Sequence, residues 1–146
     1  MRKDIRELIE ANKICVLATV SEGKPHCSLM SYAADDDCRE IYMATHKETK
    51  KYRNLITNPS VSLLIDSRQA AGGTGPERQT KALTVAGTFQ RNIDKTTLLS
   101  VRARLFEKHP ELKNIFNDPD TEIIVVKISA VQLLDGITDA YFEKVS

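Results

Sequence analysis

Apolar and polar residues alternate along much of this chain with the two-residue period of β-strands. Residues 14–20 form a run rich in β-branched residues, and the turn sequence Ser-Glu-Gly-Lys-Pro follows it. In residues 26–34 the alternation puts Leu29 on one face and Met30 and Tyr32 on the other. The whole pattern predicts six strands, at residues 14–20, 26–34, 40–45, 61–66, 83–89 and 121–133.

Helical spacing of apolar residues occurs between and around these strands. Residues 3–11 carry one apolar face, and a longer helix is predicted after the N-cap residue Asp94, ending before Pro110. A short turn follows at residues 112–116. Because strands recur at regular spacing with few βαβ units, the pattern favours a mainly β fold with peripheral helices, an antiparallel barrel in one domain spanning residues 1–146.

A further helix is predicted after the third strand. The residues Thr45-His46-Lys47-Glu48 have the Thr-x-x-Glu form of a capping box, which predicts a helix start at Thr45. The helix is expected to end at Asn58, because Pro59 disfavours a helical conformation of the residue before it.

Several cations crowd around this predicted helix start. Lys47, Lys50 and Lys51 fall in or beside the first turn, where the helix dipole makes each cation unfavourable by about 0.3–1 kcal/mol. A bound anion such as phosphate would offset this unfavourable interaction between the lysines and the helix dipole. It would be held by backbone amides, lysine charge and the hydroxyl of Thr45 or Thr49. The alternative is a solvated basic face on an ordinary helix.

Composition narrows the function classes. The 146 residues carry a net charge of +1, so the chain lacks the large positive charge that is typical of nucleic-acid-binding proteins. The cysteines Cys15, Cys27 and Cys38 are odd in number and lack a CxxC pair, which favours reduced thiols over a disulfide framework. No apolar run is long enough to cross a bilayer and no export signal is evident, so we expect a cytoplasmic protein without a membrane partner.

Motifs for protein-based chemistry are weak. The glycine-rich residues 71–76 lack the Gly-Lys-Ser/Thr ending of a P-loop. The spacing of His26, Cys27, Cys38 and His46 matches no metal-ligand pattern, so no metal site is predicted. No nucleophile elbow or paired-carboxylate site is recognisable. Any chemistry is therefore expected to come from a bound group.

The segments ICVLATVSEGKPHCSLMSYA and IYMATHKETKKYRNLITNPSVSLLID resemble the pyridoxamine 5'-phosphate oxidase-like FMN-binding split barrels. The most specific part is Thr45 at the end of a strand, the triplet Thr49-Lys50-Lys51 and the Asn-Pro after the helix. The resemblance implies a six-stranded antiparallel split β-barrel in which these groups hold the FMN phosphate. It also implies a homodimer, with the flavin between the subunits.

The resemblance also implies contacts to the flavin ring and ribityl chain from the second strand. The family's oxidases have an arginine where Ser28 stands and a lysine where Ala33 stands, so this chain lacks part of their cofactor contact. Ser67-Arg68 resembles a Ser-Arg pair in small FMN-binding proteins of the superfamily. The implied cofactor residues are Ser28, Leu29, Met30, Ser31, Ala44, Thr45, Thr49, Lys50, Lys51 and Arg68.

Taken together, these residues predict a homodimeric FMN flavoprotein that transfers hydride or electrons to an unidentified small molecule or protein. We do not expect a true pyridoxamine phosphate oxidase, because residues 137–146 lack the arginine and histidine that bind pyridoxal phosphate in the family's oxidases. One alternative is a non-enzymatic flavin electron carrier. Another is a haem-binding split barrel, which requires an axial histidine such as His26, His46 or His109.

Overall fold

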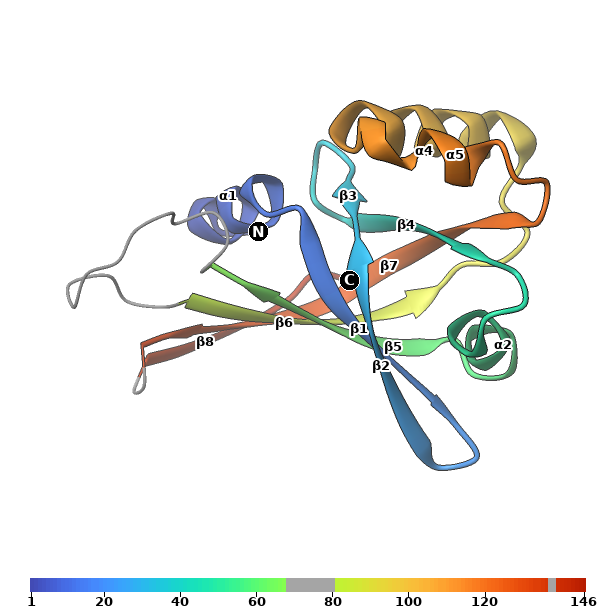
Figure 1. The fold of residues 1–146 in the computed structure, drawn as a ribbon. Helices are drawn as coiled ribbons and strands as arrows, with labels where there is room; N and C mark the ends of the chain where they lie inside the picture. Colours follow the sequence, from blue (N-terminus) through green and yellow to red (C-terminus); the bar gives the residue numbers. More distant parts are fainter. Residues whose placement is uncertain (68–80, 137–138) are drawn as a thin grey trace.

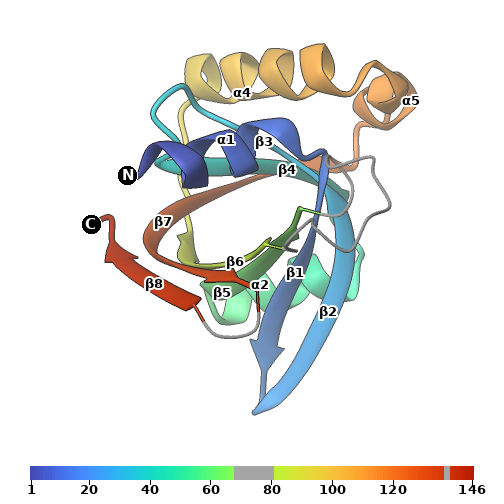
Figure 2. The same ribbon diagram turned by 90° about the vertical axis from the view of Figure 1, so that its left-hand side faces the viewer.

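The computed structural model of the protein describes residues 1–67, 81–136 and 139–146. Its centre is a single eight-stranded antiparallel sheet that curls around a hydrophobic core (Figures 1 and 2). The strand order is β2-β1-β5-β6-β7-β4-β3, and β8 pairs with β7. The strands are β1 (Ile14–Ser21), β2 (Lys24–Ser31), β3 (Ala33–Ala34), β4 (Glu40–His46), β5 (Ser60–Asp66), β6 (Lys81–Phe89), β7 (Thr121–Asp135) and β8 (Asp139–Lys144). The predicted mainly β split barrel is confirmed.

The number of strands differs from the six predicted. The segment predicted as one strand at residues 26–34 changes partner at Tyr32, because β2 pairs with β1 whereas β3 pairs with β4. The last strand, β8, was not predicted. Its side chains are all exposed or half-buried. Its sequence accordingly does not show the regular alternation of apolar and polar residues that identifies a strand with a buried face.

Helices cover the barrel from outside: α1 (Lys3–Ala11), α2 (Lys50–Thr57), α4 (Lys95–Lys108), a 3₁₀ turn (Pro110–Leu112) and α5 (Lys113–Phe116). The predicted start of α4 is confirmed, since the Asp94 carboxylate accepts from the backbone N–H of Thr97 at 3.3 Å. None of the helices in the described ranges has the length and hydropathy of a membrane-crossing helix.

The predicted start of α2 at Thr45 is wrong. Strand β4 continues through His46, which pairs with Thr121 of β7, so Thr45 and His46 are extended rather than helical. The helix instead begins four residues later with Thr49 as its N-cap. The pairing of β4 with β7 therefore determines the conformation of Thr45 and His46, and the local capping-box sequence does not.

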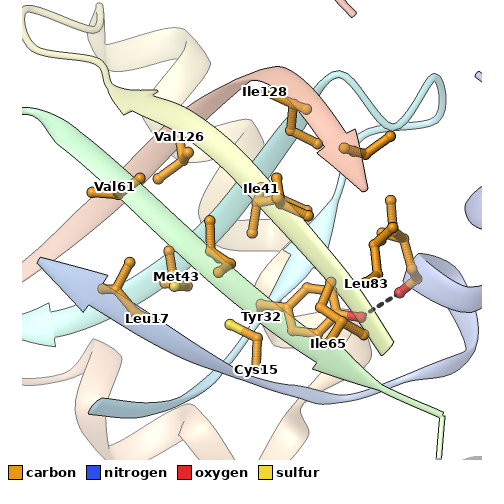
Figure 3. Packing of buried hydrophobic residues seen from close by; sticks show 14 of the residues in the cluster. Cys15, Leu17, Tyr32, Ile41, Met43, Val61, Ile65, Leu83, Val126 and Ile128 are labelled. Atoms are coloured by element: carbon orange, nitrogen blue, oxygen red, sulfur yellow. Dashed lines mark hydrogen bonds between the residues drawn. The ribbon is translucent and has the colours of Figure 1, made fainter. Parts of the chain in front are cut away.

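The barrel interior is filled by side chains from every long strand and from α1. Tyr32 is fully buried there, and its hydroxyl donates to the carbonyl of Ile9 at 2.6 Å, which fixes α1 to the barrel (Figure 3). A second cluster lies under α4, which covers β4 and β7 (Figure 1). Its buried members are Ala33, Tyr42, Val101, Leu105, Phe116 and Val125.

Candidate functional site

A hollow of about 500 Å³ opens between β2, the end of β4 and the segment that leads from α5 into β7. Strands β2 and β4 contribute one side of it, and the first turn of α2 closes one end. Its lining residues are Leu29, Met30, Ser31, Ala44, Thr45, His46, Lys51, Leu112, Asn114, Ile115, Asp118 and Thr121.

Most of the predicted cofactor residues meet at this hollow. Leu29, Met30, Ser31, Ala44, Thr45 and Lys51 line it. Thr49 lies directly beside Thr45, and Lys50 is the exposed first residue of α2. Ser28 is half-buried one position before Leu29 and does not line the hollow. Arg68 lies outside the described residues.

The two threonines form a hydrogen-bonded link between β4 and α2. The Thr49 hydroxyl donates to the carbonyl of His46 at 2.9 Å and accepts from the backbone N–H of Tyr52 at 3.4 Å. The Thr45 hydroxyl lies 3.2 Å from the Thr49 hydroxyl and is the donor of that pair, because the Thr49 proton is already used. A rotation of the Thr45 hydroxyl would turn its proton toward an anion in the hollow.

The first turn of α2 provides further donors. The N–H groups of Tyr52 and Arg53 bond to the side chain and the carbonyl of Thr49. The backbone N–H groups of Lys50 and Lys51 come before the first of these helical hydrogen bonds. They are therefore the unpaired donors that a helix N-terminus offers to an anion.

The lysines at this position differ in their partners. The ammonium of Lys47 lies 3.0 Å from Asp120, and this hydrogen bond raises the pKa of Lys47. Lys50 and Lys51 have no carboxylate within ion-pair distance among residues 1–67, 81–136 and 139–146. The prediction that grouped Lys47 with the other two is therefore wrong: only Lys50 and Lys51 lie in the first turn with their charge uncompensated.

The walls of the hollow are largely apolar. Met30 is 6% exposed and forms part of the barrel core, whereas Leu29 is 68% exposed and Ile115 is 40% exposed. Large aliphatic side chains that remain this exposed provide apolar surface for a flat aromatic ligand or a partner chain. The hollow thus combines an apolar wall with a cationic, amide-rich end.

Position 33 explains one departure from the family's oxidases. Ala33 is 1% exposed and packs beneath α4 with Val101 and Leu105. It lines a separate hollow beside α4 and not this one, so a lysine at this position would extend from outside the site.

His46 meets Asp118 and Asp120 at the rim of the hollow, a combination that the spacing analysis missed. Its Nε2 lies 3.7 Å from Asp118 and 3.8 Å from Asp120. Its Nδ1 accepts from the backbone N–H of Glu48 at 3.2 Å, which leaves the ring proton on Nε2, facing the carboxylates. A metal ion at Nε2 needs a free lone pair there, so this hydrogen bonding favours a neutral ring with its Nε2–H toward the two carboxylates over a metal site.

The other histidines lie in different surroundings. His109 is 1% exposed, with Nε2 2.7 Å from the carbonyl of Tyr32 and Nδ1 3.3 Å from Glu111. Both of its nitrogens are thus engaged, and axial ligation of haem would break these contacts. His26 lies on β2 and pairs with Thr19 across the sheet, outside the lining of the hollow.

Leu112, Asn114, Ile115, Asp118 and Thr121 line the hollow but were not predicted. The pairing of β4 with β7 brings them there, since His46 lies opposite Thr121. A prediction of that antiparallel pair would have placed residues 112–121 beside Thr45. The local sequence, a short apolar turn followed by Asn-Asp-Pro-Asp, carries no separate signal.

Comparison with known proteins identifies the family. A sequence profile described as pyridoxamine 5'-phosphate oxidase matches residues 1–135. The chain is 34% identical over 65 residues to General stress protein 26 of Bacillus subtilis (strain 168), which is 44% of this chain and 45% of that protein. The chain therefore spans less than half the length of this curated relative.

Solved structures share the fold at low sequence identity. A heme binding protein from Mycobacterium smegmatis has a TM-score of 0.82 at 19% identity, covering 99% of this chain and 59% of that one. A FAD-binding protein (mll6688) from Mesorhizobium loti has a TM-score of 0.74 at 18% identity, covering 94% and 96%. With the split barrel and a profile match across most of its length, this chain belongs to the pyridoxamine 5'-phosphate oxidase family.

Proposed function

We propose that the chain is a flavoprotein that binds FMN in the hollow between β2, β4 and α2. The observation that carries this proposal is the pair of uncompensated lysines, Lys50 and Lys51, at a helix start that offers free amides beside Thr45 and Thr49. A terminal phosphate satisfies the amides, the lysines and the helix dipole together. The family membership and the FAD-binding neighbour support a flavin.

The residues present fit FMN in kind. The phosphate would be held by the Lys50 and Lys51 amides, the Lys51 ammonium and the Thr45 hydroxyl, and the ring would lie against Leu29 and the neighbouring residues of β2. The bound flavin supplies hydride or electron transfer, for which these side chains are not suited. The protein positions the cofactor and excludes water from one face of it.

Two further features belong to the proposal. A homodimer would cover the exposed apolar residues around the hollow, and the reduced thiols suit a cytoplasmic location. The redox partner is a small molecule or a protein. We propose an oxidoreductase first, and an electron carrier without a substrate of its own as the alternative.

Haem is the second candidate, since one structural neighbour is a heme binding protein and His46 lines the hollow. It receives less support, because the Nε2 proton of His46 faces Asp118 and Asp120.

The test is titration of the purified chain with FMN, FAD and hemin, monitored by absorbance and flavin fluorescence. We expect saturable FMN binding with quenched fluorescence, and weaker FAD binding because the adenylate would extend from the phosphate into the α2 terminus. Saturable hemin binding with a Soret band and no FMN binding would overturn the proposal. With FMN bound, NADH or NADPH turnover with an acceptor distinguishes an enzyme from a carrier.

A further inference from the structure

A hollow of about 290 Å³ lies between the helices α4 and α5, and we call it the α4–α5 hollow. Figure 2 shows both helices outside the barrel, on the same side of it. None of the residues that line this hollow lines the FMN hollow. The two are therefore separate, and what the α4–α5 hollow binds does not depend on the proposed cofactor.

Most of the lining is apolar. The buried Phe116 ring contributes to it, with its centroid 6.5 Å from that of Phe106. Leu99 is 64% exposed and Phe106 is 41% exposed, and Ala103 between them is exposed as well. Residues at this spacing of four and then three share one face of a helix. Helix α4 thus carries a second apolar stripe, in addition to the one that packs on the barrel.

The polar side chains of the lining are Arg102, Lys113 and Asn117, and no lining residue is acidic. The Arg102 Nη2 donates to the carbonyl of Phe116 at 2.8 Å, and its guanidinium carbon lies 5.3 Å from the centroid of the Phe116 ring. These contacts orient the guanidinium and leave its other N–H groups available.

The charges of these two cations are uncompensated. Across residues 1–67, 81–136 and 139–146, no carboxylate lies within ion-pair distance of Arg102 or Lys113. The FMN hollow differs in this respect, because Asp118 accompanies Lys51 in its lining. The α4–α5 hollow therefore combines an apolar surface with positive charge alone, which is complementary to an anion that carries an apolar group.

We propose that the α4–α5 hollow binds a medium-chain fatty acid. The alkyl chain lies along the stripe from Leu99 to Phe106, and the carboxylate accepts hydrogen bonds from Arg102 and Lys113. A guanidinium presents its N–H groups in a fork that matches the two oxygens of a carboxylate. The stripe is seven residues long, or about 10 Å along the helix axis, which suits a chain of medium length.

Size and charge favour this ligand over a macromolecule. A specific protein interface uses about 20–30 residues from each partner, whereas this hollow is lined by seven. Its volume is close to the lower end of small-molecule pockets, about 300 Å³. A second copy of the chain would fit poorly, because a two-fold contact centred on this face would bring Arg102 and Lys113 close to the same cations of the other copy.

The test is a titration of the ¹⁵N-labelled chain with decanoate, followed by amide chemical shifts. We expect saturable shifts at residues 99–106 and 113–117, equal with and without FMN, because the two hollows share no lining residue. Decanol has the same chain without the charge, and it should bind at least about tenfold more weakly because the charge-assisted hydrogen bonds are missing. Equal affinity for decanol, or decanoate shifts that leave both helices unaffected, would overturn the proposal.

Variants assign the binding to individual side chains. Lys113→Glu should weaken decanoate binding at least about tenfold and keep the melting temperature, because Lys113 is exposed. Leu99→Ser should weaken it about fivefold through lost apolar contact. Leu29→Ser is the matched control, since Leu29 is similarly exposed but lines the FMN hollow, and it should bind decanoate as the original chain does. Undiminished binding by a folded Lys113→Glu chain, or an equal loss in both leucine variants, would place the ligand elsewhere and overturn the assignment.

Discussion

At the scale of single residues, the partner of each lysine decides its role. Lys47, Lys50 and Lys51 are close in sequence, but only Lys47 has a carboxylate partner, Asp120. The other two remain uncompensated at the N-terminus of α2, where the dipole opposes them. An FMN phosphate would convert that unfavourable arrangement into a charge-assisted binding site.

The first prediction compares these lysines. Lys50→Ala/Lys51→Ala should weaken FMN binding at least about tenfold, since charge-assisted hydrogen bonds to the phosphate are lost. Thermal stability of the apo chain should stay equal or rise slightly, because repulsion from the dipole is removed. The measurement is a fluorescence titration of FMN together with thermal unfolding of the apo chain.

Lys47→Ala is the matched control, because it removes a lysine of the same cluster whose charge is already paired. We expect its FMN affinity to stay within about twofold of the original, as for a surface ion pair that contributes little. If the double variant binds FMN as tightly as this control, the phosphate lies elsewhere.

The same residues show how much of the site the sequence could predict. The Thr49-Lys50-Lys51 triplet and Leu29 to Ser31 were found from local patterns and the resemblance, and the structure gathers most of them around one hollow. The opposite wall, with Ile115 and Asp118, was missed because it depends on a long-range strand pair. His46 was considered with cysteines, whereas its neighbours in space are aspartates from that wall.

At the scale of elements, alternation predicted every long strand and the Asp94 cap predicted α4, because each depends on local chemistry. The start of α2 and the partner change at Tyr32 were missed, since sheet pairing decides both.

Strand pairing also places a buried glycine, Gly87, at the register shift between β6 and β7. A Cβ at that position would lie 2.5 Å from Cγ1 of Val126 and 2.8 Å from the carbonyl oxygen of Lys127.

The second prediction follows from that close approach. Gly87→Ala should lower the free energy of unfolding by about 1–3 kcal/mol, because the backbone of β7 must move to accept the methyl group. Thr88→Ala, one position further on the exposed face of β6, should change it by less than about 0.5 kcal/mol. Urea denaturation of both variants gives the comparison. Equal stability of the two variants would show that β7 yields without strain.

At the scale of the whole molecule, we expect several exposed apolar side chains to be covered in an assembly larger than one chain. Leu29 is 68% exposed and Phe142 is 60%. Our third prediction is that the FMN-bound protein is a dimer, with a mass by light scattering of twice the 16.4 kDa of one chain. A single 16.4 kDa species at micromolar concentration with FMN bound would contradict it.

The fourth prediction concerns the substrate, and it depends on the charges of the entire hollow. Oxidation of pyridoxamine phosphate requires cations for the substrate phosphate in addition to those that hold the FMN phosphate. Among the described residues, Lys51 and His46 are the basic side chains of the lining, and His46 faces Asp118 and Asp120. The described end of the chain does not line the hollow, since β8 pairs with the far half of β7 and Glu143 lies 3.4 Å from the N-terminal amine. We therefore expect the FMN-loaded protein to form no pyridoxal phosphate from pyridoxamine or pyridoxine phosphate, measured by absorbance, although dithionite reduces its flavin. Turnover near one per second, an ordinary enzymatic rate, would mean that residues outside this lining provide the second phosphate site.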